Sequence, residues 1–105
     1  MGYMFRWSKF TGNISDWDVS NVVNMCSMFE CSVFNGDISG WDVSHVTDMS
    51  SLFYYSKFTK NLYNWNINPI CKTDNMFVGC AIKDEYRPKL LRIFYESFDF
   101  SSVKK

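Results

Sequence analysis

A strict 24-residue period runs through most of this sequence. Three successive segments, residues 10–33, 34–57 and 58–81, each begin with Phe and carry Trp at the same place. The first two segments are identical at 13 of their 24 positions, and the third keeps apolar residues where the others have them. An uninterrupted period of about 20–50 residues indicates one structural unit per repeat, with the units stacked in register.

Three ladders of aromatic residues recur at this period and define the predicted core. One 24-residue unit cannot bury its own apolar side chains, so each ring is expected to pack on its equivalents in neighbouring units. The predicted structural ladders are Trp17, Trp41 and Trp65; Phe10, Phe34 and Phe58; and Phe29, Phe53 and Phe77.

Each unit is predicted to contain a short strand and then a helical turn. Around Trp41, the residues Ile38 and Val43 favour a strand. In the second half of the unit, Val46, Met49 and Leu52 recur at a spacing of three, which is typical of one or two helical turns. The predicted fold class is therefore an α/β repeat of 24-residue coils, with a short parallel strand and a short helical turn in each coil.

The ends of the chain depart from the period, and the whole sequence is predicted to form one domain. Residues 1–9 read as a truncated N-terminal unit or cap, because Met4 and Phe5 align with Met28 and Phe29. Residues 82–105 are predicted to form a C-terminal cap. This cap is expected to be a capping helix around residues 88–98, where apolar residues repeat on one face after Pro88. A helix that docks onto a partner is the alternative.

The repeated phrase F-x3-I-x2-W-D-V-S-x-V-x2-M-x2-M-F-x2-S resembles the BspA-like repeat of bacterial surface proteins and mycoplasma lipoproteins. Residues 10–32 and 34–56 carry it well, residues 58–80 carry it in degraded form, and the resemblance covers residues 4–81. The resemblance implies a leucine-rich-repeat-like, right-handed solenoid with surface or interaction roles and no catalytic activity. Similar repeats occur in large DNA viruses and in protists.

A ladder of acidic residues is the first candidate for chemistry. Asp18, Asp42 and Asn66 share one repeat position, and stacked carboxylates could bind Ca²⁺. Asn replaces Asp freely at this position, which favours a role in satisfying the backbone groups of turns. We therefore predict no metal and no cofactor, with a Ca²⁺-binding repeat protein as the less favoured alternative.

The remaining reactive side chains form no catalytic or zinc-binding pattern. The spacings of Cys26, Cys31, Cys71 and Cys80 match no zinc motif, and the thiols are expected to be free. The single histidine, His45, occupies a repeat position that also accepts Asn and Pro, so it is predicted to lie on the surface. These features indicate that the protein is not an enzyme.

Charge and hydropathy restrict the classes of partner and the location that we expect for this protein. The chain carries 11 basic and 11 acidic residues, which argues against nucleic-acid binding and against a polybasic membrane surface. No run approaches the roughly 18 apolar residues of a membrane span, and the first ten residues lack the apolar region of a signal peptide. We therefore expect no membrane insertion, and an intracellular or virion location rather than secretion.

Aromatic residues outside the ladders are the candidate contacts with partner proteins, because aromatic side chains concentrate at binding hot spots. The predicted function is a non-enzymatic protein–protein interaction module, in the form of a small structural subunit of a larger assembly such as a virus particle, where it would be a minor capsid-type component. A bacterial or protist surface adhesion protein is the alternative. The candidate contacts are Tyr3, Trp7, Tyr54, Tyr55, Tyr86, Tyr95 and Phe100.

Overall fold

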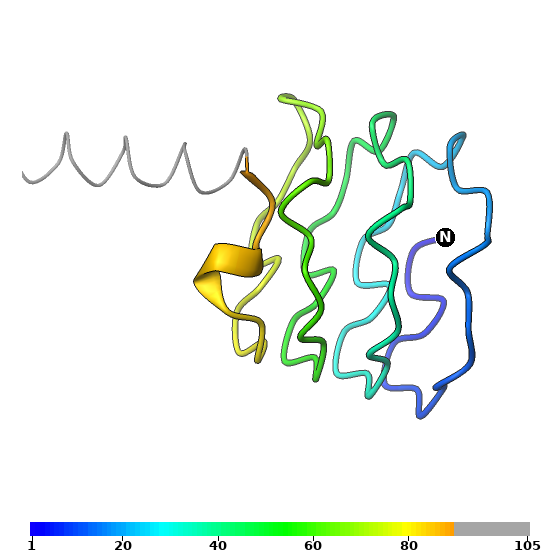
Figure 1. Ribbon diagram of the computed structural model, residues 1–105, viewed down its shortest axis with the longest axis vertical. Coiled ribbons are helices and arrows are strands. Elements are labelled where there is room, and N and C mark those ends of the chain that lie inside the picture. The colour runs from blue at the N-terminus through cyan, green and yellow to red at the C-terminus, as the bar shows by residue number, and fades with distance from the viewer. Residues whose placement is uncertain (90–105) are drawn as a thin grey trace, which may run out of the picture.

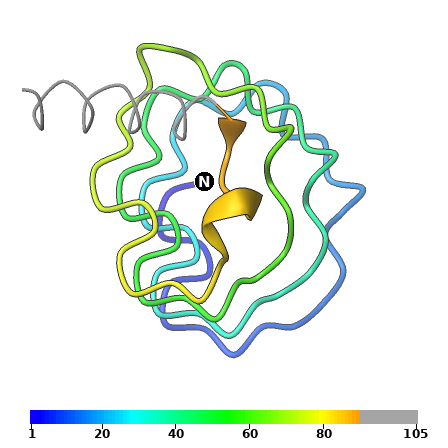
Figure 2. The same ribbon diagram turned by 60° about the vertical axis from the view of Figure 1, so that its left-hand side comes forward.

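The successive 24-residue units lie side by side as irregular loops. A computed structural model describes residues 1–89 of the chain. Figure 1 shows the loops of the three units next to one another, with the N-terminal segment at one end and residues 82–89 at the other. Figure 2, which looks more nearly along the row of loops, shows that their outlines superpose.

The predicted fold class, a leucine-rich-repeat-like solenoid of strand-plus-helix coils, is wrong. Across residues 1–88 the only helix is η1 (Asp84–Tyr86), a single 3₁₀ turn. The only sheet-like pairings in the described part of the chain are two isolated parallel bridges, which join Asn24 to Asp48 and Asp48 to Lys72. The predicted capping helix around residues 88–98 lies almost entirely outside the described residues.

The expected strand fails because a turn interrupts it. The backbone N–H of Trp41 donates to the carbonyl of Ile38 at 3.1 Å, and the N–H of Ser39 donates to the side chain of Asp37 at 3.0 Å. Both bonds fold the backbone locally, so the apolar residues of this segment reach the core from bends rather than from a pleated ladder.

The expected helical turn fails because the backbone N–H groups alternate between two kinds of partner. The N–H of Leu52 donates to Met49 three residues back, whereas the N–H of Phe53 donates to Met76 in the next unit. A helix would send every N–H back along its own unit. Ser51 and Tyr55, which have positive φ values of 57° and 51°, break the helical path between these turns.

The core is a stack of aromatic rings with apolar residues around it. Neighbouring rings of the Phe29 ladder are nearly parallel, with centroids 5.6 Å apart between Phe29 and Phe53 and 5.5 Å apart between Phe53 and Phe77. Phe34 and Phe58 are fully buried beside this stack. The contacts that hold one unit to the next are therefore ring stacking in the core and backbone hydrogen bonds at the turns.

Residues after the third unit cover the core at its C-terminal end. Ile82 is buried, and Tyr86 at the end of η1 packs against the core. The carbonyl of Tyr86 accepts a 2.8 Å hydrogen bond from the N–H of Leu62. Figure 2 shows η1 lying within the outline of the last loop, so this segment covers the centre of the stack.

Candidate functional site

The N-terminal end of the stack carries an exposed aromatic surface, which we call the N-terminal face. The half unit of residues 1–9 packs mainly beside the second half of unit 10–33, through backbone bonds such as Phe5 N–H to Met28 O at 2.9 Å. Within the described chain the first half of that unit is covered only in part on this side, where the Phe5 ring stacks on Phe10 at 4.5 Å and lies 6.0 Å from Trp17. The N-terminal face comprises Tyr3, Met4, Phe5, Trp7, Phe10 and Trp17.

The exposed fractions of the three ladder Trp side chains show that the core is less well covered at the N-terminal face. Trp41 and Trp65 are 5% and 3% exposed, whereas Trp17 is 41% exposed. The indole N–H of Trp41 donates to Ile14 O in the preceding unit at 3.1 Å. For Trp17 the equivalent carbonyl would belong to a unit beyond the N-terminal face, and within the described chain the aromatic neighbour of its ring is Phe5, at 6.0 Å.

A turn at the edge of the face presents two aromatic rings around one cation. Tyr3 and Trp7 both have positive φ, 64° and 58°, and are 56% and 68% exposed. The Arg6 guanidinium lies 5.4 Å from the ring centre of Tyr3 and 4.7 Å from that of Trp7. Arg6 also pairs with Glu30 of the next unit at 3.5 Å. The two rings and the cation therefore form a preorganised contact surface.

The hydroxyl of Tyr3 at this turn has a raised pKa. A hydrogen bond with the Cys26 thiol is the main cause that raises the pKa of Tyr3, and electrostatic interaction with the same thiol adds to it. Tyr3 is therefore a neutral phenol at physiological pH, suited to contact rather than to proton transfer.

The other predicted contact residues fall in different places. Tyr54 and Tyr55 lie on the flank of the stack, with their rings edge to face at 4.7 Å. Only Tyr55 of this pair is exposed, and its ring covers Gly79 in the next unit. Tyr86 is partly buried against the core at the opposite end. Tyr95 and Phe100 lie outside the described residues.

Sequence reasoning missed four of the six residues of the N-terminal face, and the cation beside them. Met4, which is 51% exposed, and Phe5 were not among the predicted contacts, and Phe10 and Trp17 were assigned to the buried ladders. Arg6, which lies between the two aromatic rings, was also missed. The signal that could have identified them was the half-length of the first unit, which leaves the next unit partly uncovered.

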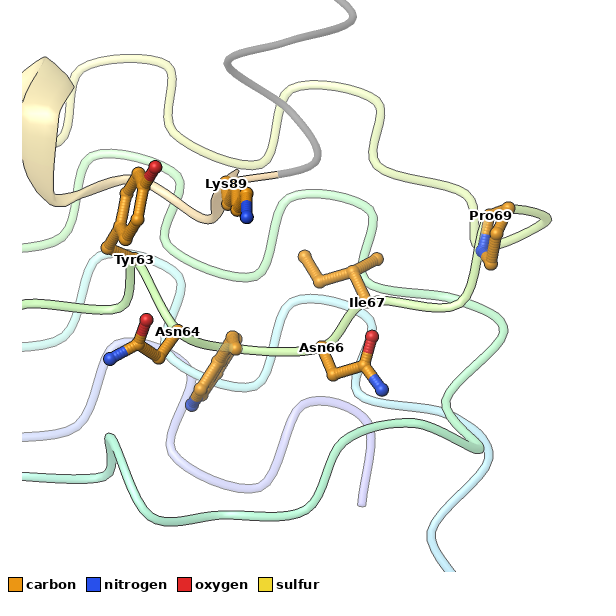
Figure 3. A pocket seen from close by; sticks show the side chains of 7 residues that line it. Tyr63, Asn64, Asn66, Ile67, Pro69 and Lys89 are labelled. Carbon is orange, nitrogen blue, oxygen red and sulfur yellow. The ribbon is translucent and has the colours of Figure 1, made fainter.

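A shallow pocket of about 440 Å³ opens on the last unit (Figure 3). It is lined by backbone and side chains of residues 63–67, Pro69 and Lys89. Tyr63 and Lys89 approach its upper rim, and Pro69 lies at its far end. Its side chains are amides, apolar groups, one phenol and one ammonium, so no nucleophile–base pair lines it.

The acidic ladder is engaged in turns. Asp18 Oδ1 accepts hydrogen bonds from both the N–H and the hydroxyl of Ser20, at 3.0 and 2.6 Å, and Asp42 does the same with Ser44. These bonds lower the pKa of both carboxyl groups. Within the described chain no three His, Cys, Asp or Glu side chains come together as a metal site.

The remaining candidates are dispersed. His45 is exposed, and the four cysteines are free thiols. Burial raises the pKa of Cys71 and, more completely buried, of Cys80. Both groups are therefore protonated and weakly nucleophilic at neutral pH. Among residues 1–89 there is no helix long and apolar enough to cross a membrane.

Comparison with known proteins identifies a family. The model of the family described as "Mycoplasma protein of unknown function, DUF285" matches residues 1–87, which include all three units, the half unit of residues 1–9 and most of residues 82–89. No curated protein and no solved structure shows significant similarity to the chain. The match confirms the resemblance to the BspA-like repeat: this chain belongs to the DUF285 family.

Proposed function

We propose that this protein is a non-enzymatic protein–protein interaction module that binds through its N-terminal face. One observation carries the proposal: six apolar and aromatic residues gather at an end of the stack that the described chain leaves uncovered. Contiguous exposed apolar surface of this kind marks an interaction site in a folded protein.

The chemistry of the face supports a protein partner. Trp7, Tyr3 and Arg6 are of the residue types that dominate binding energies at protein interfaces. Positive φ values and hydrogen bonds to the next unit hold the turn in place, so little conformational entropy is lost on binding.

Within this class we propose a subunit of a larger assembly, as in a virus particle, and keep surface adhesion as the alternative. The buried ladders leave the ends of the stack as the surfaces with unsatisfied packing, which suits end-to-end contact with neighbouring subunits. An adhesion protein would instead bind through the flank, where Tyr55 is exposed.

The experiment compares partner capture by three tagged baits: the natural chain, Met4→Lys and Tyr55→Ser. Met4 and Tyr55 are both exposed, so both variants should fold, which thermal melts verify. We expect Met4→Lys to lose the proteins that the natural chain captures from a native extract, because it places a charge in the apolar face. Photo-crosslinking from position 17 should join the same proteins to the face. Capture that survives Met4→Lys but fails with Tyr55→Ser would contradict the proposal and favour a flank site.

A further inference from the structure

The two ends of the described chain correspond to different parts of one repeat unit. By the 24-residue register, residues 1–9 correspond to 25–33, the second half of a unit, and residues 82–89 correspond to 58–65, the first half. The structure keeps this register at the C-terminal end. Ile82 is buried and is the equivalent of Phe58 one unit later, and Tyr86 lies beside its own equivalent, Leu62.

The backbone hydrogen bonds of the turns run in one direction, because alternate N–H groups there donate to carbonyls of the following unit. Outside these turns some bonds run the other way, as from Thr47 N–H to Val23 O at 2.8 Å and from Lys57 N–H to Ser32 O at 3.1 Å. In the first step these bonds join Tyr3 N–H to Cys26 O, Phe5 N–H to Met28 O and Trp7 N–H to Glu30 O, at 2.9, 2.9 and 2.7 Å. The same bonds recur one unit later, from residues 27, 29 and 31, and again from 51, 53 and 55.

This direction leaves a row of donors at one end and a row of acceptors at the other. The N–H groups that continue the pattern, those of Asn75, Phe77 and Gly79, donate to no acceptor within residues 1–89. The carbonyls at the other end, those of Gly2, Met4 and Arg6, accept no hydrogen bond within the same residues. Unpaired edge groups of this kind are a template for pairing with another chain.

We propose that this protein assembles head to tail with further copies of itself, so that the donor row of one copy pairs with the acceptor row of the next. The proposal rests on the proposed function and names the partner of the N-terminal face. A second copy presents what that face lacks: N–H groups at the matching spacing, beside residues 82–89, which supply part of the half unit that would precede residues 1–9.

The side chains at the two ends match in the same register. Met4 and Phe5 of one copy would lie over Met76 and Phe77 of the other, as they lie beside Met28 and Phe29 within a chain. Phe10, which is half-buried against Phe5 within the chain, would meet Ile82. Arg87, whose guanidinium lies 5.2 Å from the ring centre of Phe77, would have to move aside. This movement would disturb the ion pair between Arg87 Nε and Asp84 Oδ1 at 3.5 Å, which contributes little because the Asp84 side chain is highly exposed.

Charge offers a sign-specific test of the register. Arg6 pairs with Glu30, its equivalent one unit on, at 3.5 Å. In a head-to-tail stack, Arg6 of one copy would lie one unit after Val78 of the preceding copy, just as Glu30 lies one unit after Arg6 within a chain. Val78 is 45% exposed, so a charge there is compatible with folding. Val78→Lys should oppose assembly through repulsion from Arg6, and Val78→Glu should preserve or strengthen it.

The experiment is sedimentation velocity of the full chain over a range of concentrations. The contact uses different surfaces on the two copies, so the natural chain should form oligomers that lengthen with concentration. Val78→Lys should lower the association constant by about tenfold or more, whereas Val78→Glu should not lower it. Ile70→Lys, a charge on an exposed residue of the same unit away from the donor row, is the control and should leave association unchanged.

Mixing separates head-to-tail contact from other arrangements. Met4→Lys disables the acceptor end, and Val78→Lys disables the donor end. Each alone should remain monomeric, and a mixture should form a 1:1 dimer through the one intact end of each. Val23→Lys, an exposed change on the flank, is the control for the Met4 variant. Thermal melts of all variants check that they fold.

Two results would overturn the inference. The natural chain could stay monomeric at every concentration, or Val78→Lys alone could dimerise like the natural chain, which would mean that two N-terminal faces meet. If Met4→Lys still abolishes capture of another protein in either case, the proposed function stands and only the identity of the partner is wrong. If Met4→Lys affects neither self-association nor capture, both proposals fail.

Discussion

At single positions, the turns hold bulky residues in a left-handed backbone conformation that L-residues usually avoid. These residues fall into two columns spaced by 24, and each column contains residues of quite different size. The first column is Tyr3, Ser27, Ser51 and Asn75, and the second is Trp7, Cys31, Tyr55 and Gly79. The turn, rather than the side chain, therefore sets the conformation, and only the last position of the second column is Gly.

Gly79→Ala should destabilise the protein by about 1–2 kcal/mol or more, because φ is +71° there and left-handed backbone costs an L-residue roughly this much. The added Cβ would also lie 2.5 Å from the Tyr55 ring. Gly40→Ala is the control, since nothing lies within 4 Å of its Cβ position. Urea unfolding measures both, and repeating Gly79→Ala in a Tyr55→Ala background separates the clash from the backbone cost. Equal losses at Gly79 and Gly40 would contradict this explanation.

Trp41→Ala should cost about 3–5 kcal/mol of unfolding free energy, in the range for truncating a buried Trp. Its ring is buried, and its indole N–H is bonded to Ile14 O at 3.1 Å. Trp17→Ala should cost distinctly less, because the Trp17 ring is exposed on the N-terminal face. Chemical denaturation of the two variants checks the order. Losses of equal size would mean that Trp17 is covered in solution.

At the scale of the element, Asp side chains close turns that stand where strands were expected. Asp37, like Asp18 and Asp42, accepts both the N–H and the hydroxyl of the Ser two residues later. At the equivalent position of the first unit, the Asn13 side chain accepts the N–H of Ser15 at 2.9 Å without a charge. The amide oxygen therefore suffices for the turn, and the carboxylate adds a charge-assisted bond.

Stability should fall in acid because of these turns. Their hydrogen bonds hold the pKa of Asp18, Asp37 and Asp42 below the ordinary value. A depressed folded-state pKa contributes stability above the unfolded-state pKa of about 3.9, and this contribution is lost as pH falls through the folded-state pKa. Replacing all three by Asn should flatten the decline below about pH 4, as measured by urea midpoints against pH. An unchanged acid decline in this variant would show that other carboxyl groups cause it.

The sequence could identify which residues pack on one another but not the backbone that brings them together. The spacing of 24 relates Phe29 to Phe53, whose rings lie 5.6 Å apart. The strand and helix assignments were wrong because Asp37 and the positive-φ residue Ser51 redirect the backbone, and side-chain periodicity is insensitive to both. At the N-terminal face, Tyr3 and Trp7 were identifiable as surplus aromatics. The exposure of Trp17 was not, because it depends on what covers the neighbouring unit.

At the scale of the whole molecule, the stack differs at its two ends, and hydrogen exchange should reveal this. The N–H of Phe53 lies in the stack and donates to Met76 O at 2.9 Å, whereas the equivalent N–H of Phe77 has no acceptor within residues 1–89. In dilute protein, we expect the Phe77 amide to exchange much faster than that of Phe53. At concentrations where copies associate, the Phe77 amide should slow while that of Phe53 changes little. Amide exchange followed by NMR gives both rates, and equal protection in dilute protein would contradict a free donor row.

The hydrogen bonding at the turns also has a genetic consequence. Through its turn, each unit accepts from the unit before it and donates to the unit after it, so an in-frame duplication or deletion of 24 codons joins a donor row to an acceptor row again. Both terminal surfaces survive such an event unchanged. Unit number can therefore vary by recombination between the similar segments 10–33 and 34–57, which share 13 of 24 residues, without new residues having to evolve at either end. Length becomes a heritable trait that selection can adjust independently of binding.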